Sequence, residues 1–220
     1  TEKQEGWGVG VSRKVWPAAN KASAGQPDGA LKSQLEKMFA GPVCLDNDAA
    51  LAGLGEAHRG AGRGYPIVVY VTVSTGVGGV KIEHGRIDEN AFGFEPGQQI
   101  IMVGDQPQTL EDLVSGGSVE RRFGRPPAEI TDDKTWQELS YYLAIGLANT
   151  LLHWSPDCLV LGGSMFKIPG FRVETLTKLI VEHLKIFPKP PVVHRTTLDE
   201  SSGLCGALVY LRGLSTDRVF

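Results

Sequence analysis

Val73-Ser74-Thr75-Gly76-Val77-Gly78-Gly79 follows directly on an apolar run, Ile67 to Val71. A buried strand that ends in two hydroxyl side chains and three glycines within four residues is typical of a turn that handles phosphate. Glycine lets the backbone approach an anion without a Cβ in the way, and N–H groups and the Thr75 hydroxyl then supply donors. Because glycine-rich hairpin turns are also common without a ligand, this stretch alone leaves both interpretations open.

Three further elements accompany this turn. Asp48 lies twenty-seven residues before Thr75, within Leu45-Asp46-Asn47-Asp48-Ala49-Ala50. A second strand with a Gly-Gly ending, Leu159-Val160-Leu161-Gly162-Gly163, and a third glycine turn, Ser202-Gly203-Leu204-Cys205-Gly206-Ala207, follow downstream. In this order the four elements resemble the ROK family of sugar kinases and related repressors, within the superfamily of sugar kinases, actin and heat-shock ATPases.

The resemblance extends from about Gly41 to Leu211 and includes sequence between the motifs, such as Tyr142 to Asn149. It implies an α/β chain with the actin-like, ribonuclease H-like fold of a two-lobed ATPase, whose active site lies in the cleft between the lobes. We expect residues 1–66 to form part of an incomplete N-terminal lobe that carries the catalytic aspartate. Residues 67–220 are expected to form the C-terminal lobe that binds nucleotide and sugar, with a last helix that can pack on the N-terminal lobe.

Hydrophobic periodicity independently predicts strands that alternate with helices, which is typical of an α/β protein. Two of the strands alternate like a β-hairpin. The expected strands are Trp7–Val11, Pro42–Leu45, Ile67–Val73, Val77–Glu83, Cys158–Leu161 and Val192–Thr196, and the expected helices are Asp28–Ala40, Asp48–His58, Lys134–Trp154, Gly170–Phe187 and Gly203–Leu214.

Composition excludes several classes of partner. The net charge is −3 with both signs scattered, so the chain has no electrostatic footprint for nucleic acid or an anionic membrane. No apolar run approaches the roughly 20 residues of a membrane helix, and no signal peptide opens the sequence. The scattered cysteines Cys44, Cys158 and Cys205 indicate reduced core residues in a cytoplasmic protein.

Asn47 and Asp48 lie where a predicted strand gives way to a predicted helix. One interpretation is a helix N-cap, since Asp and Asn are favoured there. The other is a general base, which phosphoryl transfer needs to accept the proton of the attacking hydroxyl. The resemblance implies the second role for Asp48 and a sugar hydrogen bond for Asn47.

Two other carboxylates acquire a role only through the resemblance. Glu95 and Glu111 would by themselves be read as solvated acidic side chains. The family has a Glu-x-Gly-His motif at the first position and a Cys-Leu-Glu element at the second, and both glutamates bind sugar hydroxyls. The family's histidine is Gln98 here, so its sugar contact becomes an amide.

The same comparison predicts that no zinc is bound. Most family members hold a structural zinc through the histidine of that motif and cysteines before the second glutamate. This chain has Gln98 and Thr109 at the corresponding positions, and no cysteine between Cys44 and Cys158. Zinc needs about four N, S or O ligands, which this segment does not supply.

The resemblance also implies that ATP and Mg²⁺ are used. The turn residues Ser74, Thr75, Gly76, Gly78 and Gly79 are expected to hold phosphate. The nucleotide is expected to lie against glycines of the two downstream elements. These are Gly162, Gly163, Gly203 and Gly206.

The superfamily opens with an Asp-x-Gly-x-Thr turn that wraps phosphates and organises Mg²⁺, and residues 1–40 contain no match to it. We expect either an upstream segment or the loss of that part of the lobe. A chain beginning at Thr1 should therefore bind sugar weakly and show little kinase activity, whereas a longer form with the turn should be active.

The predicted function is ATP-dependent phosphorylation of a hexose or a hexose derivative, with sugar and nucleotide as partners and a homodimer left open. Glucose, mannose, fructose, an acetylated hexosamine and allose all remain candidates. The alternative is a non-catalytic sugar-binding regulator. Family repressors add an N-terminal helix-turn-helix, and this chain has no basic recognition-helix candidate.

Overall fold

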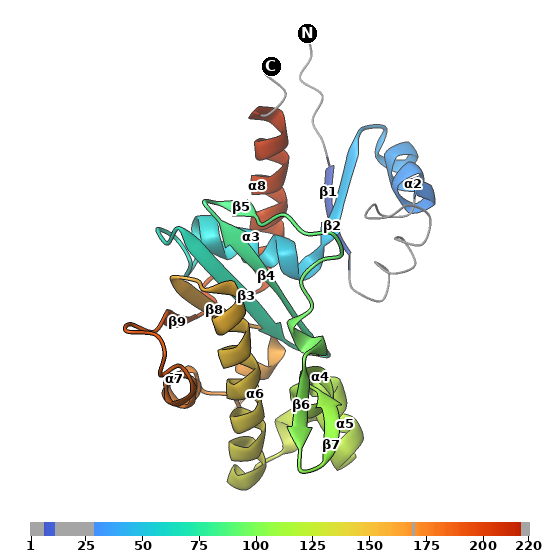
Figure 1. Ribbon diagram of the computed structural model, residues 1–220. Coiled ribbons are helices and arrows are strands. Elements are labelled where there is room, and N and C mark those ends of the chain that lie inside the picture. The colour runs from blue at the N-terminus through green and yellow to red at the C-terminus, as the bar shows by residue number, and fades with distance from the viewer. Residues whose placement is uncertain (1–6, 12–28, 169, 217–220) are drawn as a thin grey trace.

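A five-stranded sheet forms the centre of the protein (Figure 1). The structure, a computed structural model, describes residues 7–11, 29–168 and 170–216. The strand order is β5-β4-β3-β8-β9, where β4 runs antiparallel to β3 and β5, and β3, β8 and β9 run parallel. The bounds are β3 Ile67–Val73, β4 Val77–Glu83, β5 Arg86–Ile87, β8 Cys158–Gly162 and β9 Val192–Arg195.

The predicted hairpin is confirmed. Val73 of β3 pairs with Val77 of β4, so the tight connection consists of residues 74–76. The register of the parallel strands places Thr72 beside Gly162. The carboxyl ends of β3 and β8 therefore meet at one edge of the sheet. The turn that follows β3 and the turn that follows β8 lie next to each other at this edge.

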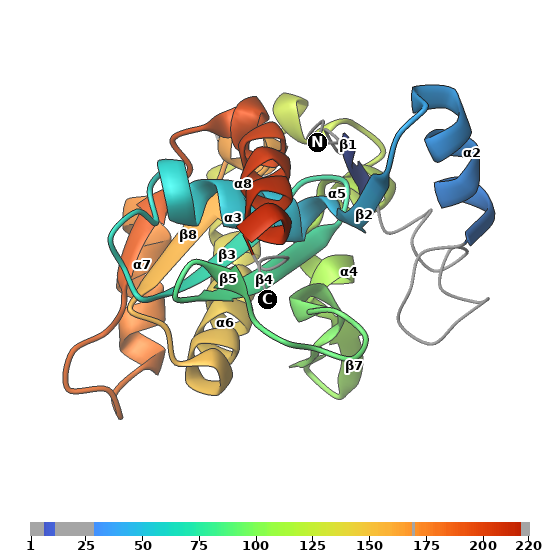
Figure 2. The same ribbon diagram turned by 90° about the horizontal axis from the view of Figure 1, so that it is seen from above.

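Helices α3 (Asp48–Arg59) and α8 (Ser202–Thr216) cover one face of the sheet (Figure 2). Their backbones approach very closely, because a Cβ at Gly206 would lie 1.7 Å from the Leu51 carbonyl oxygen and one at Gly55 would lie 2.2 Å from the Ser202 carbonyl oxygen. Glycine at both positions permits this crossing. α8 thus packs on a helix from residues 1–66, while the lobe boundary at residue 66 stays a prediction.

Helices α6 (Asp133–Trp154) and α7 (Val173–His183) cover the opposite face and enclose the larger hydrophobic core. The Asp132 side chain caps α6 by accepting the N–H of Thr135 at 2.9 Å. α7 begins later and ends earlier than the predicted Gly170–Phe187. Gly170 instead packs on the Trp136 ring, where a Cβ would lie 2.5 Å away, and the sequence after Phe187 is rich in proline.

A smaller unit lies beyond the edge of the sheet where β3 ends. Hydrophobic periodicity did not predict its strands and helices. Strands β6 and β7 form an antiparallel hairpin, and the short helices α4 and α5 follow it (Figure 1). The bounds are η1 Pro96–Gln98, β6 Ile100–Val103, β7 Gln106–Thr109, α4 Leu110–Val114, α5 Gly116–Phe123, η2 Pro127–Glu129, η3 Ser164–Phe166 and η4 Asp199–Ser201.

Strand β1 (Trp7–Val11) pairs in parallel with β2 (Val43–Asn47), and α2 (Gly29–Phe39) packs on β2 through a small apolar cluster. β2 continues to Asn47, beyond the predicted end at Leu45, because its ladder to β1 extends to Val11. Of the free cysteines, Cys158 is buried as predicted, and Cys44 and Cys205 are only half-buried. Among the described helices, none is long and apolar enough to cross a membrane.

Candidate active site

The turn after β3 and the turn after β8 contact each other directly. The Ser74 hydroxyl oxygen accepts the N–H of Ser164 at 3.0 Å, and the Ser74 N–H donates to the Gly76 carbonyl at 2.8 Å. Gly163 has φ +102°, and a Cβ there would lie 2.3 Å from the Val73 carbonyl oxygen. Only glycine suits this conformation and this spacing. The predicted phosphate turn and the predicted adenosine turn are therefore neighbours.

The glycines of the first turn are needed for space rather than for a left-handed backbone. Neither Gly76, Gly78 nor Gly79 is among the described glycines with positive φ. A Cβ at Gly76 would lie 2.7 Å from Glu111 Oε2, and one at Gly79 would lie 2.8 Å from Pro96 Cγ. Protein atoms therefore occupy part of the space that the sequence pattern assigned to an anion.

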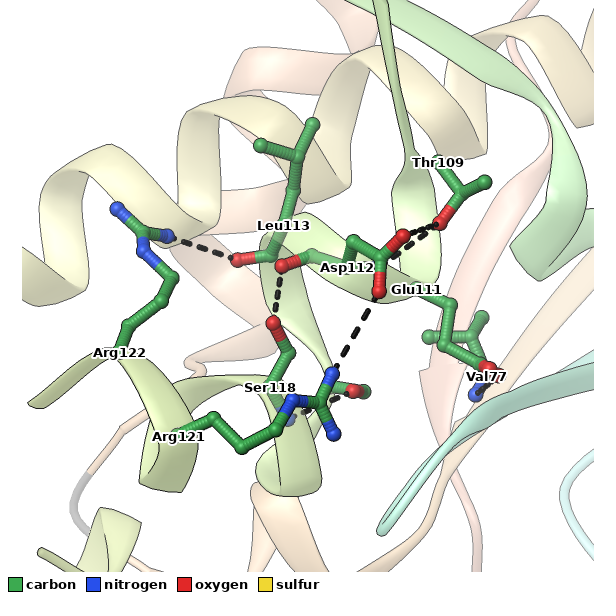
Figure 3. Close-up of polar contacts among 9 residues, drawn as sticks. Val77, Thr109, Glu111, Asp112, Leu113, Ser118, Arg121 and Arg122 are labelled. Carbon is green, nitrogen blue, oxygen red and sulfur yellow. Dashed lines mark hydrogen bonds and ion pairs between the residues drawn. The ribbon is translucent and has the colours of Figure 1, made fainter. Parts of the chain in front are cut away.

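Residues of α4 and α5 hold this turn from the other side. Glu111 Oε2 accepts the N–H of Val77 at 2.8 Å (Figure 3). The N–H groups of Gly116 and Gly117 donate to the carbonyls of Ser74 at 2.7 Å and of Thr75 at 3.2 Å. Thr75 is exposed at the tip. Within the described part of the chain, the backbone N–H groups of Thr75 and Gly76 have no hydrogen-bond acceptor.

α4 itself is fixed by a polar cluster (Figure 3). The Thr109 side chain caps the helix by accepting the N–H of Asp112 at 3.0 Å, and its hydroxyl donates to the Asp112 carboxylate at 2.8 Å. The Ser118 hydroxyl donates to the Asp112 carbonyl, and Arg121 pairs with the Asp112 carboxylate at 3.5 Å. Thr109, at the position where the resemblance implies a cysteine, thus has a defined role as a helix cap.

A pocket of about 90 Å³ lies beside β4. Asn47 and Glu95, two predicted sugar ligands, both line it, together with Gly79 of β4, which was predicted to hold phosphate. The aromatic ring of Phe94 packs edge-on against Trp154, with 4.9 Å between the ring centroids. This contact fixes the loop that carries Glu95. Gln98 is exposed on η1 and does not line this pocket. The pocket therefore unites Asn47, Glu95 and Gly79, whereas Asp48, Gln98 and Glu111 are not among its lining residues.

Asn47, not Asp48, is the N-cap of α3. Its Oδ1 accepts the N–H of Ala49 at 2.9 Å and that of Ala50 at 3.1 Å. Asp48 is the first helical residue, reaches solvent, and accepts the Ala49 N–H at 2.8 Å. Desolvation by neighbouring protein atoms raises the pKa of Asp48, and the Ala49 N–H only partly offsets this effect. The capping function does not depend on the Asp48 carboxyl.

The two glycines predicted in α8 differ in their surroundings. Gly206 faces α3, and packing against Leu51 accounts for glycine there. A Cβ at Gly203 would meet no atom within 4 Å. Of the two, only Gly203 borders open space at the start of α8, and nucleotide roles for both stay predictions.

Two residues near the site, Gln99 and Glu56, were not identified from the sequence. Gln99 anchors η1, because its Nε2 donates to the carbonyls of Pro96 at 2.7 Å and Gly146 at 3.1 Å. Glu56 is a fully buried carboxylate of α3. A glutamate on a helix that otherwise buries small apolar residues was a signal for Glu56, whereas nothing distinguished Gln99 from its neighbour Gln98.

No group of three or more His, Cys, Asp or Glu side chains among the described residues is placed to hold a metal ion. The predicted absence of zinc stays a prediction. Mg²⁺ usually needs only one or two carboxylates, together with waters and substrate phosphates, so this finding places no limit on it.

Comparison with known proteins adds a family match. The ROK family model matches residues 10–213. A fructokinase of Lactococcus lactis subsp. cremoris is 31% identical over 152 residues, which are 64% of this chain and 51% of the relative. The chain thus spans about half the length of this curated relative.

Solved structures give the fold. A ROK hexokinase from Thermus thermophilus superposes with a TM-score of 0.74 at 30% identity, covering 87% of this chain and 72% of the other. A ROK family glucokinase from Streptomyces griseus, in complex with glucose and AMPPNP, has a TM-score of 0.71 at 22% identity and coverages of 86% and 74%. The predicted α/β, actin-like fold is confirmed.

Proposed function

The chain belongs to the ROK family, and from this membership we propose that the protein phosphorylates a hexose or a hexose derivative at the expense of ATP. The relatives named fructokinase, hexokinase and glucokinase support a sugar kinase. The glucokinase complex supports sugar and an adenine nucleotide as the pair of ligands. The cytoplasm is the compartment that we propose for this activity.

One observation carries the proposal. Gly79 of β4 lines the pocket together with Asn47 and Glu95, and β4 begins at Val77, directly after the turn of residues 74–76 whose Ser74 contacts Ser164. The candidate sugar pocket and the candidate nucleotide edge are therefore joined by one short stretch of chain. Phosphoryl transfer depends mainly on such positioning, together with electrostatic stabilisation.

Each residue has a proposed part. Asp48 accepts the proton of the attacking sugar hydroxyl, and its raised pKa makes it a stronger proton acceptor. Asn47 and Glu95 orient the sugar, with Glu111 and Gln98 as further proposed sugar contacts. When bound, the nucleotide supplies the phosphoryl group, and Mg²⁺ would accompany its phosphates. The N–H groups of Thr75 and Gly76 and the Thr75 hydroxyl are the proposed phosphate donors.

The test is ADP release with ATP and each of glucose, mannose, fructose, an acetylated hexosamine and allose. The 220-residue chain and any longer native form are assayed side by side. We expect ADP release that requires both substrates. A difference in activity between the two forms would measure what the additional residues contribute.

The same experiment separates the sugar-binding regulator from the kinase. Sugar binding by calorimetry without ADP release from the native-length protein would favour the regulator. Failure to bind either sugar or ATP would overturn the proposal.

A further inference from the structure

Glu56 has a buried carboxylate for which the proposed chemistry has no use. Its side chain lies on α3 with 0% exposure. Oε1 accepts the hydroxyl of Thr196, the N–H of Leu198 at 2.9 Å and the hydroxyl of Ser202 at 2.9 Å. The three donors come from the segment after β9 and from the first residue of α8, more than 130 residues further along the chain.

The second oxygen is equally engaged. Oε2 accepts the N–H of Ala61 at 2.8 Å and that of Thr197 at 3.3 Å. Desolvation by burial acts to raise the pKa of Glu56, but the hydrogen bonds from Thr196, Ala61, Leu198 and Ser202 together outweigh it and lower the pKa. The group is therefore a carboxylate whose two oxygens accept hydrogen bonds only.

The segment that Glu56 holds contains a non-glycine residue with a left-handed backbone conformation. Asp199 has φ +47°, in the left-handed region that residues other than glycine rarely adopt. Its N–H lies 3.3 Å from the Thr196 hydroxyl, and its carbonyl lies 2.8 Å from the Ser202 hydroxyl. Such a conformation persists where surrounding contacts over-determine it. Here both hydroxyls also contact the Glu56 carboxylate.

This turn leads directly to Gly203. Ser202, held by Glu56, is the residue before it, and the neighbouring Gly55 lies in backbone contact with Ser202. Resting on the proposed function, we infer that Glu56 is a positioning residue for the nucleotide. It fixes the turn of residues 196–202 against α3, so that the backbone at Gly203 is presented to the nucleotide in one orientation.

A purely structural Glu56 predicts something different. It would affect stability, and any loss of binding would be shared by sugar and nucleotide, because α3 begins at the sugar-binding end. A positioning role predicts a loss that falls on the nucleotide, since every donor outside α3 and Ala61 lies in the turn before Gly203. The two affinities measured on one variant separate these roles.

The experiment uses Glu56→Gln in the native-length protein. The amide is isosteric, but its NH₂ group must face backbone N–H donors on one side or the other, so one set of contacts becomes donor against donor. Glu129→Gln, the same change at an exposed carboxylate, is the matched control. Calorimetry gives the affinities for ATP and for the sugar, and hydrogen exchange reports on residues 196–206 and, as an internal reference, on β3.

We expect ATP affinity to fall roughly tenfold or more in Glu56→Gln, in line with the loss of charge-assisted hydrogen bonds. Sugar affinity should change by less than a factor of about two, and exchange should accelerate in residues 196–206 but not in β3. Unchanged ATP affinity, or equal losses for both ligands, would overturn the inference. A parent protein that binds no ATP would instead overturn the proposed function itself.

Ser202→Ala keeps the inference testable if Glu56→Gln does not fold. This change removes one donor and leaves the carboxylate bonded to Thr196 and to the N–H groups of Leu198 and Ala61. ATP affinity should fall by a smaller factor, of about three, again without a change in sugar affinity. A folded Ser202→Ala variant that binds ATP like the parent would overturn the inference.

Discussion

Glu111 and Val77 are joined by a hydrogen bond of 2.8 Å between the carboxylate and the backbone N–H. α4 thereby holds the centre of the glycine turn, and the same carboxylate is a proposed sugar ligand. One side chain therefore anchors the turn and is also proposed to bind sugar, although it does not line the pocket that contains Asn47 and Glu95.

Two substitutions at Glu111 separate these functions. Glu111→Gln retains an acceptor for the Val77 N–H, so ATP affinity should change by less than about threefold, whereas sugar affinity should fall because a neutral amide accepts O–H donors less strongly. Glu111→Ala removes the acceptor as well, and ATP affinity should then fall about tenfold. Calorimetry with each ligand provides the measurement. Parent-like sugar binding by Glu111→Gln would remove Glu111 from the set of sugar ligands.

Gly203→Ala tests whether the nucleotide lies against the start of α8. A Cβ there meets no protein atom within 4 Å, so the variant should fold as well as the parent and gain up to about 1 kcal/mol from helix propensity. If the nucleotide occupies that space, ATP affinity falls roughly tenfold, equivalent to about 1.4 kcal/mol. Parent-like ATP affinity would mean that the nucleotide lies elsewhere.

Gly163→Ala is the contrasting case. Its φ of +102° and the 2.3 Å distance to the Val73 carbonyl mean that the folded state itself is strained by a Cβ. We expect a loss of about 3 kcal/mol in the free energy of unfolding. Denaturant unfolding measures this directly, and a loss below about 0.5 kcal/mol, the usual range for unconstrained surface sites, would contradict the geometry.

Lowering the pH should reduce the stability of the folded protein, partly through protonation of Glu56. The pKa of Glu56 in the folded state lies below the ordinary value of 4.5, so its contribution to stability is present above that value and is lost as the pH falls through the folded pKa. The melting temperature of the parent should therefore decline below about pH 4.5 more steeply than that of Glu56→Gln. Parallel declines for the two proteins would contradict this assignment.

Purified protein should contain no stoichiometric zinc. Gln98 is an amide, and the Thr109 hydroxyl is engaged as the cap of α4, so neither supplies the imidazole or thiolate that a structural zinc site usually needs. Elemental analysis that found one zinc per chain would contradict the prediction. A chelator that strongly lowered the melting temperature would do the same.

The strands of the central sheet could be predicted from the sequence more completely than the elements around the sheet. The β3–β4 hairpin follows from local alternation, so the strands Ile67–Val73 and Val77–Glu83 were predicted to pair, and the structure adds the register that places Val73 opposite Val77. β7 was missed because Gln106-Pro107-Gln108-Thr109 carries almost no strand signal; its pairing with β6 decides its conformation. Gly206 was predicted to bind the nucleotide, which stays a prediction; its close contact with Leu51 of α3, a helix distant in sequence, is a second reason for glycine there that the sequence did not reveal.

Within the candidate site, too, local features could be predicted from the sequence and contacts between distant segments could not. Asn47 at a strand-to-helix junction was readable as a cap, and it is one. The meeting of Asn47, Gly79 and Glu95 at one pocket depends on packing among distant segments, and only family resemblance anticipated it. Glu56 could not be placed from sequence, because the donors that define it lie up to 146 residues away.

The most direct test of the account is Asp48→Asn in the native-length protein. Asn47 supplies the cap of α3, so this change should leave the fold intact. We predict that ATP-dependent phosphorylation of the preferred hexose falls by roughly 10² or more, because a general base is lost. Sugar affinity by calorimetry should stay close to that of the parent. Turnover equal to that of the parent would show that Asp48 is not the base and would contradict the central claim.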